Sequence, residues 1–91
     1  MTLAELTPAL RAHLEQIGMD AGSLWSEAFR EERGRDPEPE ECDAQAAQAG
    51  DRLLRKARRA LATAGIEPDA TLLAEITEII RQKFVDFSQD A

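Results

Sequence analysis

Five cationic side chains fall within eight consecutive positions of the chain, and their types and spacing are the clearest functional signal in the sequence. Arg52, Arg55, Lys56, Arg58 and Arg59 supply five of the eleven Lys and Arg residues in a protein whose formal net charge is −7. Guanidinium and ammonium groups bind phosphates, or the carboxylates of a protein partner. A basic cluster in an acidic chain therefore needs an explanation.

The cluster lies in a segment with helical periodicity. At 100° per residue, Arg52, Arg55, Lys56 and Arg59 occupy about a third of the helix circumference, and the opposite arc is apolar. Three interpretations are open: a solvated helix face, a surface that recognises a protein partner, or a contact to phosphates. The helix macrodipole stabilises cations in the last turn, which explains Arg58 and Arg59 better than Arg52.

The sorting of charge along the same segment favours an interface. Six acids and no base lie between Asp36 and Asp51, whereas residues 52–59 carry five bases and no acid. Such blocks suit antiparallel pairing with a second copy or docking on a charged partner. The candidate partner-binding cations are Arg52, Arg55, Lys56 and Arg59.

Trp25 and Phe29 are neighbours one turn apart on a predicted helix and form the candidate apolar anchor. A half-exposed tryptophan is a frequent hot spot in protein interfaces. A buried core pair is the alternative interpretation of these two rings.

Nucleic-acid binding is retained only as the alternative function, that of a DNA-associated transcriptional regulator with residues 52–59 on phosphates. The isoelectric point of about 4.6 opposes approach to a phosphate backbone. The helix predicted after residue 69 opens with acids and aliphatics, where a recognition helix needs Arg, Asn or Gln. Nucleic acid is therefore not an expected partner.

Residues that support catalysis or metal binding are scarce. Cys42 follows two glutamates, which oppose formation of a thiolate, and His13 is the single histidine. The acidic run 36–43 lacks the glycine and the alternating spacing of a calcium loop. We therefore expect no catalytic residues, no metal and no cofactor, and predict that the protein is not an enzyme.

The composition predicts an all-α fold, because Ala, Leu, Glu and Arg dominate the sequence. Apolar periodicity predicts a small, mainly antiparallel four-helix domain with helices at roughly 3–17, 23–33, 39–64 and 70–87. The last of these has the richest apolar face, so we expect it at the centre of the core.

Local signals set the expected helix ends. Thr2 and Glu5 match a capping box, and Thr7-Pro8 indicates either a helix start or a kink. Gly18 is expected to end the first helix, as Gly34 and Gly65 are expected to end later ones.

The length of the helix 39–64 suggests a homodimer. About 26 residues span roughly 39 Å, whereas a compact globule of this size is roughly 30 Å across. The helix would therefore break at Gly50 or protrude and let a second chain approach.

The remaining features favour a cytoplasmic interaction protein. One cysteine fits a reducing compartment, and neither a signal peptide nor a membrane span is expected. We predict a non-enzymatic protein–protein interaction module: a small acidic regulator, inhibitor or accessory subunit that docks on a protein partner.

Overall fold

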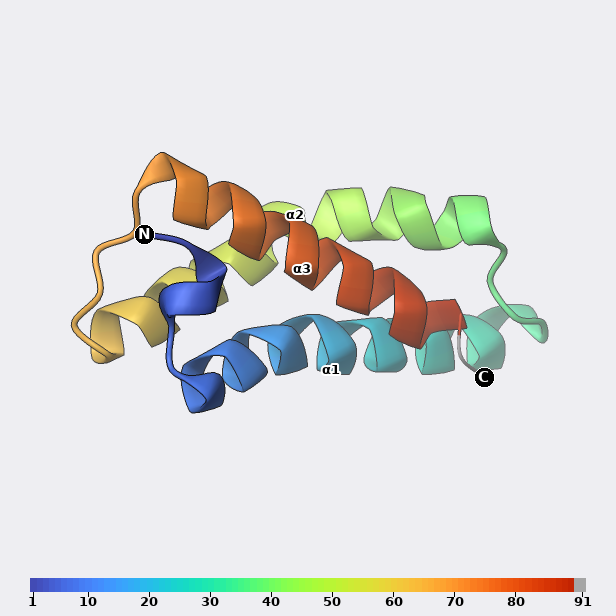
Figure 1. Ribbon diagram of the computed structural model, residues 1–91. Coiled ribbons are helices and arrows are strands. Elements are labelled where there is room, and N and C mark those ends of the chain that lie inside the picture. Colours follow the sequence, from blue (N-terminus) through green and yellow to red (C-terminus); the bar gives the residue numbers. More distant parts are fainter. Residues whose placement is uncertain (90–91) are drawn as a thin grey trace.

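The computed structural model describes residues 1–89 and shows three long helices in an up-down-up arrangement (Figure 1). A short 3₁₀ helix, η1 (Leu3–Glu5), precedes α1 (Pro8–Arg33), α2 (Pro39–Thr63) and α3 (Ala70–Gln89). The two connectors between the long helices lie at opposite ends of the molecule. No strand occurs within residues 1–89. The all-α class is confirmed, and the count of four helices is wrong.

Helix α1 continues through Gly18, so the expected helices 3–17 and 23–33 are parts of one element. Within the described residues a positive φ occurs only at Gly34 (70°) and Gly65 (75°). These two glycines end α1 and α2 as predicted, because a left-handed residue after a helix favours glycine. Gly18 has a different role, which only its packing reveals.

Gly18 and Gly22 let α1 approach the backbone of α3. A Cβ atom on Gly18 would lie 2.5 Å from the carbonyl oxygen of Ile80, and one on Gly22 would collide with the carbonyl oxygen of Phe84. Both helices bury every fourth residue along the contact: Leu14, Gly18, Gly22 and Ser26 in α1, and Ile76, Ile80, Phe84 and Ser88 in α3. Ridges of this spacing cross obliquely, as α3 does over α1 in Figure 1.

Helix α1 begins at Pro8 because Thr7 provides its cap. The Thr7 hydroxyl oxygen accepts a hydrogen bond from the backbone N–H of Leu10 at 3.2 Å, and proline fits the first helical position. The side chain of Thr2 makes no capping hydrogen bond, so the expected capping box does not form. Of the two interpretations of Thr7-Pro8, the helix start is correct.

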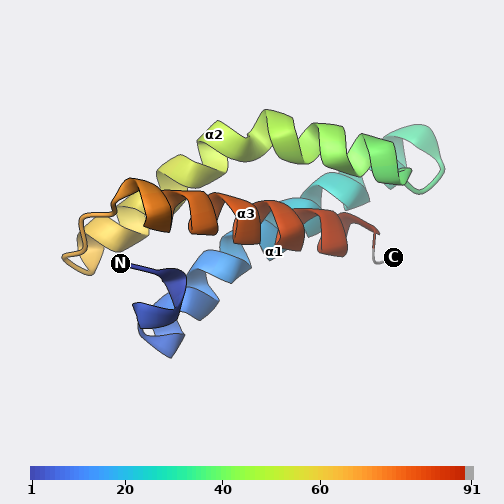
Figure 2. The ribbon, with the colours of Figure 1, turned by 45° about the horizontal axis from the view of Figure 1, so that its top comes forward.

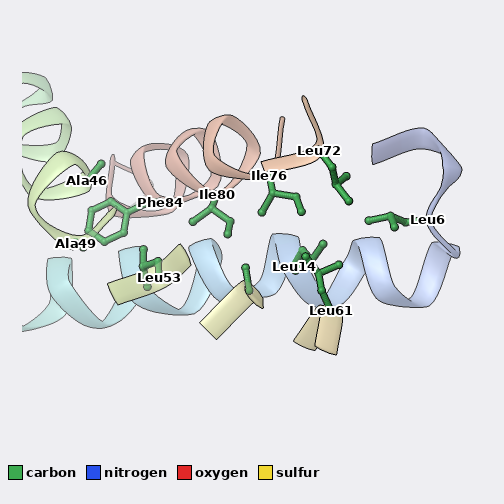
Figure 3. Packing of buried hydrophobic residues seen from close by; sticks show 11 residues of the cluster. Leu6, Leu14, Ala46, Ala49, Leu53, Leu61, Leu72, Ile76, Ile80 and Phe84 are labelled. Carbon is green, nitrogen blue, oxygen red and sulfur yellow. The ribbon is translucent and has the colours of Figure 1, made fainter. Parts of the chain in front are cut away.

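Helix α3 is the central element, as predicted from its apolar face. It packs against both other helices, whereas α1 and α2 contact each other least (Figure 2). Figure 3 shows side chains of all three helices meeting in one core, with Leu61 of α2 near Leu14 of α1, and Leu61 and Leu14 are fully buried. Within residues 1–89, none of the helices is both long and apolar enough to cross a membrane.

Helix α2 is continuous through Gly50, and its length does not make it protrude. The molecule is elongated, with extents of 43 × 21 × 19 Å, and α1 is as long as α2. The expectation of a homodimer assumed a roughly spherical globule, so the structure gives it no support. Helix α2 ends in the predicted Schellman motif, in which the N–H of Ile66 donates to the carbonyl of Leu61 at 2.9 Å.

A bidentate ion pair holds the connector between α1 and α2. The Arg35 guanidinium donates to both carboxylate oxygens of Glu41, at 2.8 and 3.1 Å, and the backbone N–H of Glu38 donates to the same carboxylate. The bond from Arg35, followed by that from Glu38, lowers the pKa of Glu41 from 4.5 to about 2. The Arg35 guanidinium also lies 4.9 Å from the ring centre of Phe29, which ties the connector to α1.

We expect Gly18→Ala and Gly22→Ala to destabilise the protein by about 1–3 kcal/mol each, because the new methyl group meets backbone that cannot rotate away. Gly50→Ala is the matched control, since a Cβ there meets nothing within 4 Å. It should stabilise the protein by about 0.5–1 kcal/mol through helix propensity. Urea unfolding measures all three, and a gain in stability for Gly18→Ala would contradict this packing.

Acid should remove the contribution of Glu41 to stability. The folded state holds the Glu41 proton more weakly than the unfolded chain does, so the charged carboxylate favours folding. This contribution is complete above pH 4.5 and is lost as the pH falls toward 2. The difference in urea midpoint between wild type and Glu41→Gln should therefore shrink over that range. The difference between wild type and Arg35→Gln should shrink in the same way. A difference that stays constant from pH 6 to pH 2 would refute the assignment.

Candidate functional site

Two adjoining pockets form an open groove between α1 and α2. The larger has a volume of about 460 Å³ and the smaller about 310 Å³, and both are lined by Trp25 and Gln45. The groove runs from His13 and Lys56 at one end to Glu32 and Glu41 at the other. We call it the α1/α2 groove. Its larger pocket is lined by Ile17, Ala21, Leu24 and Trp25 of α1 and by Arg52 and Lys56 of α2, among others.

Trp25 is held in the groove by two other aromatic rings. Its ring centre lies 5.4 Å from that of Phe29 and 5.9 Å from that of Phe84, with both pairs tilted. Tilted aromatic pairs at these distances are favourable, so the position of the indole is well defined. Trp25 remains partly accessible, and Phe84 of α3 also lines the larger pocket.

Phe29 supports Trp25 and is not itself an exposed anchor. Its side chain is 9% exposed, and the guanidinium groups of Arg33 and Arg35 lie 5.2 and 4.9 Å from its ring centre. The sequence analysis offered two interpretations of the aromatic pair, an exposed anchor and a buried core pair, and each applies to one of the two rings. Phe29 is a core residue, and Trp25 is the ring that a partner can reach.

Leu24 is the residue that the sequence analysis missed. It is 68% exposed and lines the groove together with Trp25. A signal was present: if Gly18 and Gly22 define the buried stripe, Leu24 lies about 200° from Gly22 around the helix. An exposed leucine next to a tryptophan is typical of a binding surface.

The basic cluster divides between the groove and the surface beside it. Arg52 and Lys56 line the groove, whereas Arg55 and Arg59 are exposed and outside its lining. None of the five cations forms an ion pair within residues 1–89. The arginines that do form ion pairs lie elsewhere: Arg11, Arg30, Arg35 and Arg81. Arg52, Lys56 and Trp25 are therefore the predicted site residues that the fold brings together.

Charge varies along and across the groove. The cations Arg52 and Lys56 lie on the α2 side of one end, and Asp20 lies on the α1 side. The Asp20 carboxylate accepts a hydrogen bond from the Gln16 amide at 2.6 Å. The other end carries Glu32 and Glu41. The groove therefore attracts negative charge at one end, on one side.

Within residues 1–89, the lining of the groove includes one imidazole, that of His13, and no thiol. Cys42 is fully buried and does not line the groove that His13 borders. Within the described part of the chain, no three His, Cys, Asp or Glu residues are grouped so that they could hold a metal ion. What the groove offers is an apolar floor with two unpaired cations at its edge.

Comparison of the chain with family models, with curated protein sequences and with solved structures finds no match. The function proposed below therefore rests on the groove itself. The features that support it are the exposed Leu24, the well-positioned Trp25 ring, and the unpaired cations Arg52 and Lys56, which all line one concave surface.

We expect Leu24→Ala to change the free energy of unfolding by no more than about 0.5 kcal/mol, as for other exposed positions. Leu14→Ala makes the same chemical change at a fully buried position and should cost about 2–5 kcal/mol. Urea unfolding compares the two. A loss above about 1.5 kcal/mol for Leu24→Ala would place this leucine in the core and not in a binding surface.

Proposed function

We propose that the protein is a non-enzymatic interaction module that docks on a protein partner through the α1/α2 groove. The observation that carries the proposal is the exposure of Leu24 beside Trp25, on the wall opposite the unpaired cations Arg52 and Lys56. A small regulator, inhibitor or accessory subunit acts in this way. We also propose the cytoplasm as its compartment, because the single cysteine suits a reducing environment.

The energetics of the groove favour binding to a protein surface. Complete burial of one leucine side chain contributes about 1.5–3 kcal/mol, and Leu24 has most of that gain still available. Trp25 needs little ordering on binding, because Phe29 and Phe84 already hold its ring. Arg52 and Lys56 at the edge would set the orientation and the rate of encounter more than the affinity.

A DNA-associated regulator remains the second candidate, and one observation favours it. All five cations of the cluster are exposed and form no ion pair within residues 1–89, so they are available to phosphates. Against it stands the net charge of −7, which repels a polyanion. A steep fall of DNA affinity with salt would support this candidate, and no DNA binding at low salt would eliminate it.

Reversal of the groove cations should weaken partner binding without loss of the fold. We define the groove pair as Arg52→Glu with Lys56→Glu, and the control pair as Arg58→Glu with Arg81→Glu. Each pair changes the net charge by the same amount. Arg81 borders a separate pocket between α2 and α3, and Arg58 lies one turn beyond Leu54, which lines that pocket. The Arg81–Glu78 ion pair is exposed, so its loss costs little stability.

The measurement is quantitative capture from native cytosol over a dilution series, with helical circular dichroism as the control for folding. Proteins retained by wild type and by the control pair should bind the groove pair at least about tenfold more weakly, a change of about 1.4 kcal/mol. Leu24→Glu should remove the same proteins. If the groove pair captures as wild type does, the cations are solvated surface and the proposed function is wrong.

A further inference from the structure

We infer that the occupant of the α1/α2 groove is an amphipathic helix of another protein, with acidic residues on the flank that faces α2. This inference deepens the proposed function and rests on it. It follows from the length of the groove, the spacing of its apolar residues and the placement of its charges.

The length of the groove suits a helix. Its α1 wall runs from His13 to Glu32, which at 1.5 Å per residue is about 28 Å. Trp25 and Gln45 line both pockets, which therefore adjoin along this wall. A straight helix of about 18 residues spans the same distance and would lie alongside α1 and α2 as a fourth helix.

The apolar residues of the groove are spaced to receive a helix. Ile17, Ala21, Leu24 and Ala28 recur at intervals of four, three and four along α1. This spacing forms one stripe along a helix, and a second helix packs on such a stripe with residues at positions i, i+3 or i+4, and i+7. Small side chains at residues 21 and 28 alternate with larger ones, which leaves hollows for apolar residues of the occupant.

The charges determine which helix fits. Carboxylates of the occupant would pair with Arg52 and Lys56, which have no ion-pair partner within residues 1–89. Asp20 on the opposite wall and Glu32 at the far end repel carboxylates there. The acids of the occupant therefore belong on one flank and in one half of the helix.

A second copy of this chain does not supply such a helix from its described residues. Helices α2 and α3 bury their apolar stripes in their own core, whereas the second apolar stripe of α1 is the wall of the groove itself and lies in a hollow. To fill the groove of another molecule, a helix would have to leave its own fold, at the cost of that core. The occupant therefore comes from another protein.

The test is selection from a displayed library of amphipathic helices. The library fixes leucines along one face, contains no tryptophan, and varies Glu, Gln and Lys on both flanks. Wild type should enrich Glu on one flank of one half of the helix. The groove pair should enrich Lys at the same positions, and the control pair should select as wild type does.

The strongest selected peptide, made synthetically, should shift the fluorescence of Trp25 in a saturable titration, since Trp25 is the only tryptophan of the chain. Leu24→Glu should weaken its binding at least about tenfold. The inference is overturned if no peptide is enriched, if the flanks show no charge preference, or if bound peptide leaves the Trp25 emission unchanged. It is also overturned if sedimentation of wild type alone shows self-association that shifts that emission.

Failure of the inference differs from failure of the proposed function. If native partners depend on Leu24 and the groove pair while no helix is selected, the groove binds protein by another structure, and the function stands. If native partners bind the groove pair as they bind wild type, the proposed function itself fails.

Discussion

Where α1 crosses α3, main chain lies against main chain, because Gly18 and Gly22 have no side chain to separate them from Ile80 and Phe84. Each glycine within a helix sacrifices about 1 kcal/mol of helix propensity relative to alanine. The close approach offsets this loss, since dispersion and Cα–H···O contacts gain where two backbones meet. The long axis of the molecule and the position of the central helix both depend on this contact.

The α1/α2 groove is related to this close contact between α1 and α3. Helix α3 packs more extensively against α1 than against α2, and α1 and α2 contact each other least of the three pairs. Helix α2 then packs against the core through a narrow stripe: Cys42, Ala46, Ala49, Leu53, Ala57 and Leu61. The space left between α1 and α2 is filled only in part, by Trp25 over Phe84. A more symmetric three-helix packing would close it.

Helix ends could be predicted from the sequence because their signals are local. Thr7-Pro8, Gly34 and Gly65 act on residues within one turn, and each behaves as its type dictates. Gly18 carries the same local signal but serves a contact 62 positions away, at Ile80, so local rules placed a helix end there. The length argument for a homodimer finds no support for a related reason, since it assumed a sphere and could not anticipate three long helices side by side. The homodimer itself stays a prediction. Arg52, Lys56 and Trp25 could be named from amphipathicity alone, but their common groove required the topology.

Under the proposed function, the basic cluster and the acidic net charge would act together in the recognition of a partner. At physiological ionic strength the field of an exposed charge decays within about 8 Å, so a ligand responds to the side chains nearest to it. An acidic partner would be attracted at Arg52 and Lys56 and repelled over most of the remaining surface, because the chain as a whole carries 18 Asp and Glu residues against 11 Lys and Arg. Repulsion elsewhere suppresses wrong orientations, and this kind of discrimination depends on unfavourable contacts as much as on favourable ones. In the proposed docking, the acidity of the chain would therefore sharpen selectivity for the end of the groove that carries Arg52 and Lys56.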